Sequence, residues 1–261
     1  MWSIACEERK VIIAYMRYYG ITDKGLIRET NQDNYVTASN EVGDVFALVC
    51  DGIGGGNGGD VASKIAVDYL SEKFSKCNGF ESDDDVRDWM NKTIRETNNL
   101  IFSKSLLSKQ LKGMGTTLVG VLITKSAKYI INIGDSRVYC LNNNDFIQIT
   151  TDHTLVEDLL KSGEISVEEA NVHPKKNILT NALGVWENVK IDIDKYNKDA
   201  DSFLICSDGL YGYTDHNKIK DVMLNRSLST IRKVKQLLKI ALDAGGYDNI
   251  TMILIELEDE L

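Results

Sequence analysis

The chain has 261 residues, of which 43% are hydrophobic and 26% charged, and its net charge is −9. This length suits one large domain with a well-buried core. An acidic chain without a cluster of Lys and Arg is a poor candidate for nucleic-acid binding, because phosphate contacts need basic residues on one face. The longest apolar runs, such as residues 45–50, are far shorter than the roughly 20 residues that cross a bilayer. The first 15 residues lack the pattern of a signal peptide, so we expect a cytoplasmic protein without membrane insertion.

Short segments rich in Val, Ile, Tyr and Phe, bounded by Gly, Asn and Asp, predict β-strands through the first half of the chain. These strands are expected at residues 35–38, 44–50, 116–123, 129–133, 137–141 and 146–149. Apolar residues at helical spacing predict long helices at 59–75 and 83–107. The second half is expected to hold a short helix at 154–161, strands at 189–192 and 202–206, helices at 216–223 and 229–244, and a last strand at 250–257.

The order of these elements favours an α+β sandwich, because strands are linked through short turns and helices are gathered in blocks. It lacks the strict β-α-β alternation of a Rossmann fold. Residues 162–186 are the least regular part of the pattern, and we expect them to form a surface insertion.

A glycine-rich stretch, CDGIGGGNGGDVAS at residues 50–63, raises the question of a nucleotide-binding loop. Residues 54–59 satisfy G-x-G-x-x-G, but no G-K-[ST] is present, which excludes a Walker loop. Asp51, directly before the glycines, would repel a pyrophosphate unless a metal intervened. We therefore interpret Asp51 as the important residue, with glycines that let the backbone approach a metal.

Five aspartates lie at the ends of predicted strands. Asp51, Asp135 and Asp208 each end an apolar strand, whereas Asp33 and Asp248 each lie just before one. Any single one could be a turn residue, because Asp-Gly and Asp-Asn are common in turns. Five carboxylates that converge on one edge would raise one another's pKa, and a divalent cation resolves that conflict. Oxygen ligands without Cys or paired His favour Mg²⁺ or Mn²⁺ over Zn²⁺.

Eight motifs along the chain occur in an order typical of one family. They are TDKGLIRETNQDNY (22–35), CDGIGGGNGGDVAS (50–63), GMGTTL (113–118), NIGDSRVY (132–139), TTDHTLV (150–156), HPKKNILTNALG (173–184), CSDGLYG (206–212) and GGYDNITMILI (245–255). Together they resemble the metal-dependent protein serine/threonine phosphatases (PPM, or protein phosphatase type 2C), in their compact bacterial branch. The resemblance covers residues 16–257, and eight motifs in order are far more specific than any one of them.

The resemblance implies a fold of two stacked antiparallel β-sheets flanked by pairs of α-helices. It also implies a single catalytic domain at residues 16–261. Residues 162–186 would be a flap beside the site, and residues 1–15 an N-terminal extension outside the resemblance.

The resemblance further implies a set of site residues. The ligands of the cations would be Asp33, Asp51, the Gly52 carbonyl, Asp135, Asp208 and Asp248. Two core Mn²⁺ or Mg²⁺ ions would be bridged by Asp51, and a weaker third ion would lie between Asp135 and Asp208. Gly212 stands where many members carry another aspartate, which puts the strength of this third site in question, and Gly56 replaces a usual histidine.

Two residues would act most directly on the substrate. Arg28 would hold the phosphate, because the guanidinium fork matches two phosphate oxygens, and Asp33 would lie beside the metal pair. A metal-activated water would then hydrolyse phosphoserine or phosphothreonine without a phospho-enzyme.

These inferences predict a signalling hydrolase that acts on phosphoproteins and opposes a cognate bacterial Ser/Thr kinase, as a monomer. One alternative is a catalytically silent phosphoprotein-binding module of the same fold, which the intact aspartates argue against. Another is a two-metal nuclease or phosphodiesterase, which the acidic charge disfavours.

Overall fold

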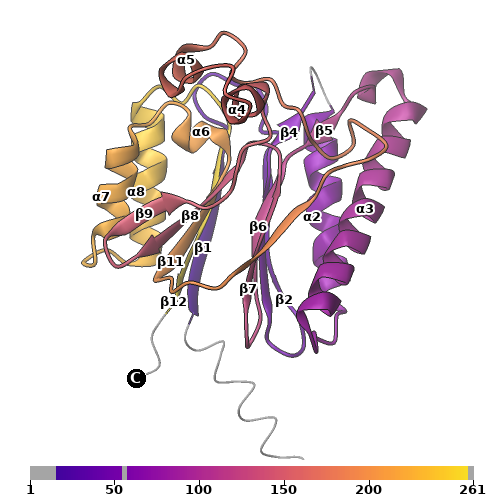
Figure 1. Ribbon diagram of the computed structural model, residues 1–261, viewed down its shortest axis with the longest axis horizontal. Coiled ribbons are helices and arrows are strands. Elements are labelled where there is room, and N and C mark those ends of the chain that lie inside the picture. Colours follow the sequence, from indigo (N-terminus) through magenta and orange to yellow (C-terminus); the bar gives the residue numbers. More distant parts are fainter. Residues whose placement is uncertain (1–15, 55–57, 258–261) are drawn as a thin grey trace, which may run out of the picture.

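The computed structural model describes residues 16–54 and 58–257. Their strands form two five-stranded antiparallel sheets that stack on each other, and helices cover the outer face of each sheet (Figure 1). The prediction of an α+β sandwich with two stacked antiparallel sheets and paired helices is therefore confirmed.

The two sheets have different strand orders. Sheet A consists, in order, of β1 (Met16–Asp23), β12 (Ile250–Leu257), β11 (Ser202–Cys206), β8 (Arg137–Asn142) and β9 (Asp145–Gln148). Sheet B consists, in order, of β10 (Asp192–Tyr196), β7 (Lys128–Ile133), β6 (Leu118–Ile123), β3 (Val45–Cys50) and β2 (Asn34–Ser39). A small ribbon pairs β4 (Gly52–Ile53) with β5 (Gly115–Thr116).

Four long helices flank the sandwich (Figure 1). Helices α2 (Gly59–Ser75) and α3 (Asp83–Leu107) cover sheet B, and α7 (His216–Leu224) and α8 (Thr230–Asp243) cover sheet A. The predicted ranges of α2 and α3 match the structure. A capping box between Ser82 and Asp85 fixes the start of α3 by satisfying backbone N–H groups that have no partner within the helix.

The core has three apolar layers, one between the sheets and one under each helix pair. The run VFALVC of β3 is buried along its whole length. Phe46 and Leu48 pack in the layer under α2 and α3, while Ala47 and Val49 pack between the sheets. A strand covered on both faces therefore reads as a continuous hydrophobic run.

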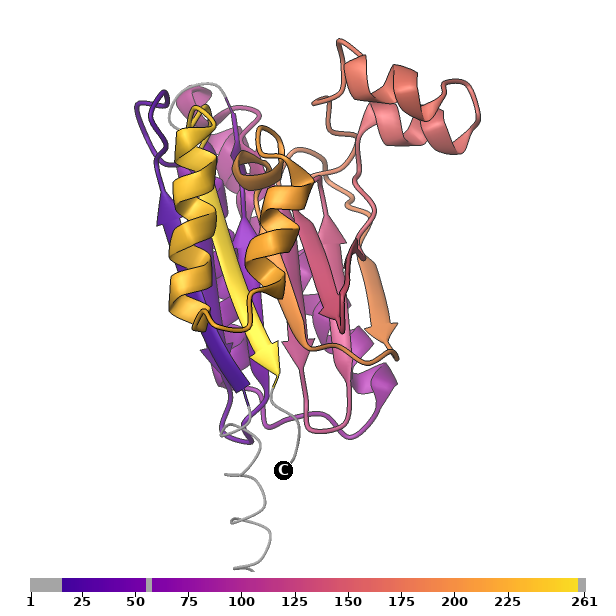
Figure 2. The same ribbon diagram turned by 90° about the vertical axis from the view of Figure 1, so that its left-hand side faces the viewer.

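The structure differs from the predicted elements in several places, and three of them bear on the edges and the surface insertion. Strand β1 was not predicted, and β10 begins three residues later than expected. The expected irregular insertion contains α5 (Val167–Val172), which pairs with α4 (Leu155–Lys161), and the two helices project from the sandwich (Figure 2). The predicted N-terminal extension, residues 1–15, lies outside the described residues.

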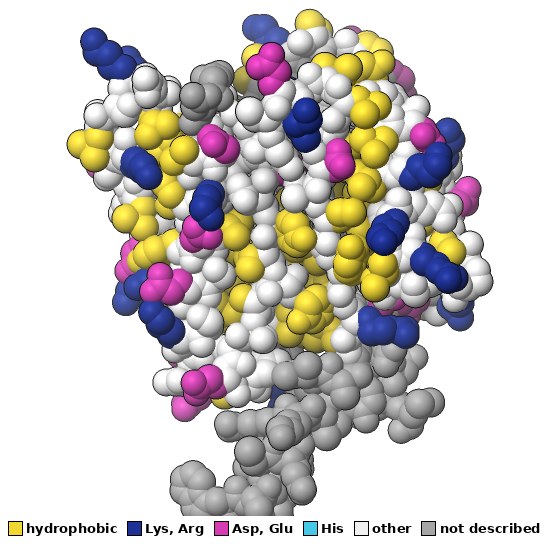
Figure 3. Space-filling model, turned by 180° about the vertical axis from the view of Figure 1, so that it is seen from behind, with side chains coloured by type: hydrophobic (Ala, Val, Ile, Leu, Met, Phe, Trp, Pro, Cys, Tyr) yellow, Lys and Arg dark blue, Asp and Glu magenta, His cyan; other side chains and the backbone are white. Residues whose placement is uncertain are grey.

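Two short helices complete the architecture. Helix α6 (Asp208–Tyr211) directly follows β11, and a 3₁₀ turn spans Lys109–Leu111. Within the described ranges, no helix has the length and apolar character needed to span a bilayer. Basic and acidic side chains are mixed across the face seen in Figure 3, so this face lacks the continuous basic stripe that nucleic-acid binding requires.

Candidate active site

The five predicted aspartates meet at one edge of the sandwich, and the strand directions explain why. Neighbouring strands are antiparallel, so the starts of β2 and β12 lie at the same edge as the ends of β3, β7 and β11. One pocket of about 550 Å³ at this edge is lined by Arg28, Asp51, Gly52, Asp135, Asp208 and Asp248, among others.

The loop that carries Arg28 is anchored to the start of β12. Arg28 donates to Asp248 Oδ2 at 2.6 Å, and 55% of the Arg28 side chain is exposed. The Asn249 side chain accepts from the backbone N–H of Gln32 at 2.8 Å and donates to the carbonyl oxygens of Lys24 and Thr30 at 2.9 and 3.0 Å. The same asparagine therefore fixes both ends of this loop.

Asp33 lies at the buried floor of the site, with 4% of its surface exposed. Its Oδ2 accepts from Ser207 Oγ at 2.8 Å, while its Oδ1 is buried without a hydrogen-bond partner. Burial raises the pKa of Asp33 to about 7, and hydrogen bonds from Ser207 and Thr251 partly oppose that rise. An unpaired buried carboxylate oxygen is costly, so it points to a ligand or a water at this position.

The pKa values of the other carboxylates show how strongly they interact. Burial and then the charges of Asp33, Asp208 and other aspartates raise the pKa of Asp51 well above its ordinary value. Burial and Asp208 raise the pKa of Asp135 to about 7. Burial and Asp248 raise the pKa of Asp208 to about 6, although a hydrogen bond with Asp51 opposes this. Opposite charge placed among these groups would favour their ionised forms.

The Asp51 backbone is held firmly by the neighbouring strand. Its carbonyl accepts from Thr117 N at 2.8 Å and from Thr116 Oγ1 at 2.9 Å, and its N–H donates to Thr117 Oγ1 at 2.9 Å. Thr117 Oγ1 also lies 2.7 Å from Ser136 Oγ. These contacts link the end of β3 to the segment that carries Asp135.

The oxygen atoms at this edge fit a hard divalent cation, because they belong to carboxylates and a backbone carbonyl. One of them, Asp33 Oδ1, is buried without a hydrogen-bond partner. No three His, Cys, Asp or Glu side chains of the described chain already form a group that could hold an ion. The ligand roles of these residues stay predictions, and Asp248 Oδ2 is paired with Arg28 in this structure.

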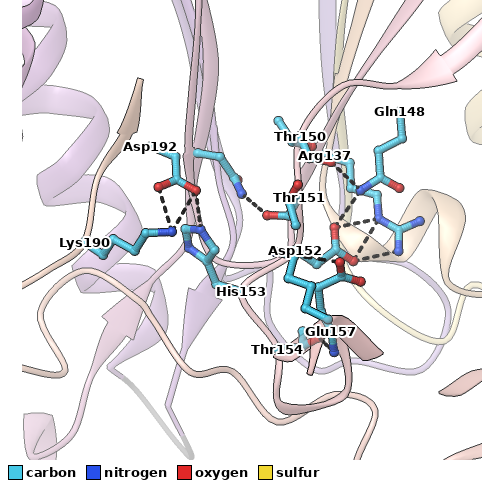
Figure 4. Close-up of polar contacts among 12 residues, drawn as sticks. Arg137, Gln148, Thr150, Thr151, Asp152, His153, Thr154, Glu157, Lys190 and Asp192 are labelled. Atoms are coloured by element: carbon cyan, nitrogen blue, oxygen red, sulfur yellow. Dashed lines mark hydrogen bonds and ion pairs between the residues drawn. The ribbon is translucent and has the colours of Figure 1, made fainter. Parts of the chain in front are cut away.

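Asp135 lies on the crossover from β7 in sheet B to β8 in sheet A, and the segment 150–154 braces this crossover (Figure 4). His153 Nδ1 accepts from Gly134 N at 3.2 Å, and His153 N donates to Gly134 O at 2.9 Å. Since Nδ1 accepts, Nε2 donates to Asp192 Oδ2, 2.8 Å away on β10.

The neighbouring residue, Asp152, points to the other sheet. It pairs with Arg137 at the start of β8, with a shortest distance of 2.7 Å (Figure 4). The Arg137 guanidinium also lies 3.6 Å from the centre of the Tyr211 ring, and Tyr211 donates to the Asp135 carbonyl at 2.8 Å. Adjacent side chains of one segment thus tie the two sheets together around Asp135.

Comparison with known proteins agrees with this geometry. The sequence matches the protein phosphatase 2C family over residues 28–245. The chain belongs to the protein phosphatase 2C family. The resemblance inferred from the motifs is therefore confirmed.

Similar proteins within the family match almost the whole chain. It is 41% identical to the serine/threonine phosphatase stp of Listeria welshimeri, over 90% of this chain and 93% of that protein. It is 32% identical to the protein phosphatase PhpP of Streptococcus pneumoniae, over 92% of this chain and 97% of that protein. The crystal structure of the serine/threonine phosphatase Stp1 of Staphylococcus aureus superposes with a TM-score of 0.88 at 33% identity, over 94% of this chain and 96% of that chain.

This protein phosphatase 2C member has a second pocket beside the first, of about 370 Å³, under α4 and α5. Asp135, Asp208 and Asn177 line both pockets. Lys176, Tyr211 and other residues of the flap and of α6 line only the second. The projecting helices therefore roof a space that is continuous with the aspartate cluster.

Sequence reasoning missed two positioning residues. Asn249 lies within the GGYDNIT motif, where only the aspartate drew attention, and an Asn after an Asp that precedes a strand could have indicated a loop anchor. Arg137 lies in the NIGDSRVY motif, and nothing local indicated its pairing with Asp152. Gly56, noted as replacing a histidine, lies outside the described residues.

Proposed function

We propose that this protein hydrolyses phosphoserine and phosphothreonine in proteins, with divalent cations, Mn²⁺ or Mg²⁺, at the aspartate edge. The observation that carries this proposal is the pocket that Arg28 shares with Asp51, Asp135, Asp208 and Asp248. Family membership supports it, as do relatives that are named serine/threonine phosphatases.

Oxygen donors at this edge suit a pair of cations and a weaker third. Asp51, the Gly52 carbonyl, Asp208 and Asp248 would hold the pair, and Asp135 with Asp208 would hold the third. When bound, such cations supply positive charge and lower the pKa of a water.

The protein's own residues would position the substrate. Arg28 would bind two phosphate oxygens in place of Asp248, and it can turn because more than half of its side chain is exposed. The unpaired Oδ1 of Asp33 would accept a hydrogen bond from a water in the site, while Ser207 keeps its other oxygen fixed. Asn249 would keep the Arg28 loop in place.

A silent phosphoprotein-binding module is not favoured, because the relatives are named as phosphatases and every predicted carboxylate is present. A cognate Ser/Thr kinase, a monomeric state and a cytoplasmic location stay predictions from the sequence.

The test is a Mn²⁺ titration of hydrolysis of p-nitrophenyl phosphate and a phosphothreonine peptide, with reversal by EDTA. We expect Asp51→Asn to lose at least about a hundredfold in kcat, since removing a group that acts in the transition state lowers kcat. Asp145→Asn is the matched control, because Asp145 is exposed at the β8–β9 hairpin, away from the pocket. Metal-independent turnover, or normal turnover by Asp51→Asn, would refute the proposal.

Arg28→Ala tests the phosphate role separately. We expect it mainly to raise KM for the phosphothreonine peptide, because a ground-state contact is lost. An unchanged KM would remove Arg28 from the proposed site.

A further inference from the structure

Four exposed apolar side chains lie on or against the segments that carry Arg28 and its partner Asp248, and we call them the apolar rim: Leu26, Ile27, Tyr213 and Tyr247. Their exposed fractions are 66%, 63%, 46% and 51%. Single exposed apolar residues are ordinary on protein surfaces, but a group beside a functional pocket marks a contact site.

The rim is assembled from three segments that are held together. Gly246 O accepts from Leu26 N at 2.8 Å and from Ile27 N at 3.3 Å. A Cβ on Gly246 would lie 2.9 Å from Leu26 Cγ, so the leucine side chain lies directly over this glycine. The rings of Tyr213 and Tyr247 pack together with centroids 5.1 Å apart.

The rim adjoins the residue proposed to hold the phosphate. Leu26 and Ile27 directly precede Arg28, and Tyr247 directly precedes Asp248, the partner of Arg28. Tyr213 lines the second pocket, which shares Asp135 and Asp208 with the first. A polypeptide whose phosphate contacts Arg28 would therefore place its neighbouring residues beside the segments that carry the rim.

We propose that the apolar rim binds an aromatic or large aliphatic side chain next to the phosphorylated residue, and so selects phosphopeptides with an apolar neighbour. This inference rests on the proposed phosphatase function and names its substrate class. The first pocket itself is lined mostly by polar residues, with Ile53 and Leu179 as its apolar members.

The experiment compares kcat/KM for phosphothreonine peptides that differ only in having Phe or Ser next to the phosphothreonine, on either side. Burying one large apolar side chain is worth about a tenfold change in affinity. We therefore expect wild type to prefer a Phe peptide about tenfold, and the double variant Tyr213→Ser, Tyr247→Ser to lose most of this preference, since only Leu26 and Ile27 of the rim remain. Because the readout is a ratio of two peptides, a general loss of activity cancels.

Tyr18→Ser is the matched control. Tyr18 is a tyrosine of β1 with 45% exposure, paired with Ile255 toward the end of the sheet away from the site. It should retain the wild-type preference. Equal kcat/KM for the Phe and Ser peptides in wild type, or an unchanged preference in the double variant, would overturn this inference alone. A wild-type protein that hydrolyses neither p-nitrophenyl phosphate nor any peptide would overturn the proposed function and this inference with it.

Discussion

Replacing Asn249 by Ala tests whether the Arg28 loop is positioned from β12. The change removes three hydrogen bonds, to Gln32 N, Lys24 O and Thr30 O, at a residue with 6% exposure. Each such bond contributes about 1 kcal/mol net. Lys24 and Thr30 are exposed, so water can replace part of the loss. We expect the free energy of unfolding to fall by about 2 kcal/mol.

The functional effect should appear in substrate binding. A loss of about 2 kcal/mol lowers Tm by about 4–8 °C for a chain of this size. Because the loop carries Arg28, we also expect KM for a phosphothreonine peptide to rise about fivefold, with a smaller change in kcat. Thermal unfolding and steady-state kinetics on the same preparation measure both quantities.

Asn91→Ala is the matched control, since Asn91 makes one side-chain bond, to Arg87 O at 2.9 Å within α3. It should change Tm by much less and leave KM unaltered. If Asn249→Ala left both Tm and KM at the wild-type values, the loop would not be positioned as argued.

Two further predictions concern the crossover and the carboxylate cluster. His153→Ala removes contacts to Gly134, Asn181 and Asp192. We expect the free energy of unfolding, measured with urea, to fall by about 2–3 kcal/mol. We also expect half-maximal hydrolysis of p-nitrophenyl phosphate to require a higher Mn²⁺ concentration. An unaltered Mn²⁺ requirement would limit His153 to a structural role. The last prediction concerns the metal-free protein in EDTA, where the pKa is raised to about 7 for Asp33 and to about 6 for Asp208. Above the ordinary aspartate pKa, the folded chain therefore binds more protons than the unfolded chain. The contribution of these groups is therefore fully present below the ordinary aspartate pKa and is lost progressively as pH rises from there to the folded values of about 6 and 7. A urea midpoint in EDTA that instead rose over this range would contradict the assignment.

The sequence predicted best where one periodicity dominated. Helices α2 and α3 have strong apolar spacing, and their predicted ranges match the structure. The prediction that aspartates at strand ends converge required only that the strands be antiparallel. By contrast, β1 is the edge strand of sheet A, pairs with β12 and is half-exposed on both faces, so it lacks a clear apolar alternation.

Other errors arose from contacts between distant residues. Residues 189–191 look like a strand, but the Asn181 side chain bonds both the N–H and the carbonyl of Lys190. The backbone groups of Lys190 therefore bond to a side chain of the 162–186 segment instead of a neighbouring strand, and β10 begins only at Asp192. The apolar pattern of residues 189–191 does not indicate this exchange of hydrogen bonds with a residue nine positions earlier. No local pattern indicates the pairing of Arg137 with Asp152 either.

The position of the carboxylate cluster explains why so many hydrogen bonds hold its residues in place. Asp33, Asp51 and Asp135 flank strands of sheet B, whereas Asp208 and Asp248 flank strands of sheet A. Their repulsion therefore acts across the interface between the two sheets. It is opposed by the apolar layer between the sheets, by local hydrogen bonds and by the positive charges of Arg28 and Arg137. Ser207 on Asp33, the threonines on Asp51 and the 150–154 segment around Asp135 all lie at this edge. Cations bound by aspartates of both sheets would remove the repulsion between these carboxylates. The aspartates that repel one another without metal would then hold the two sheets together when metal is bound.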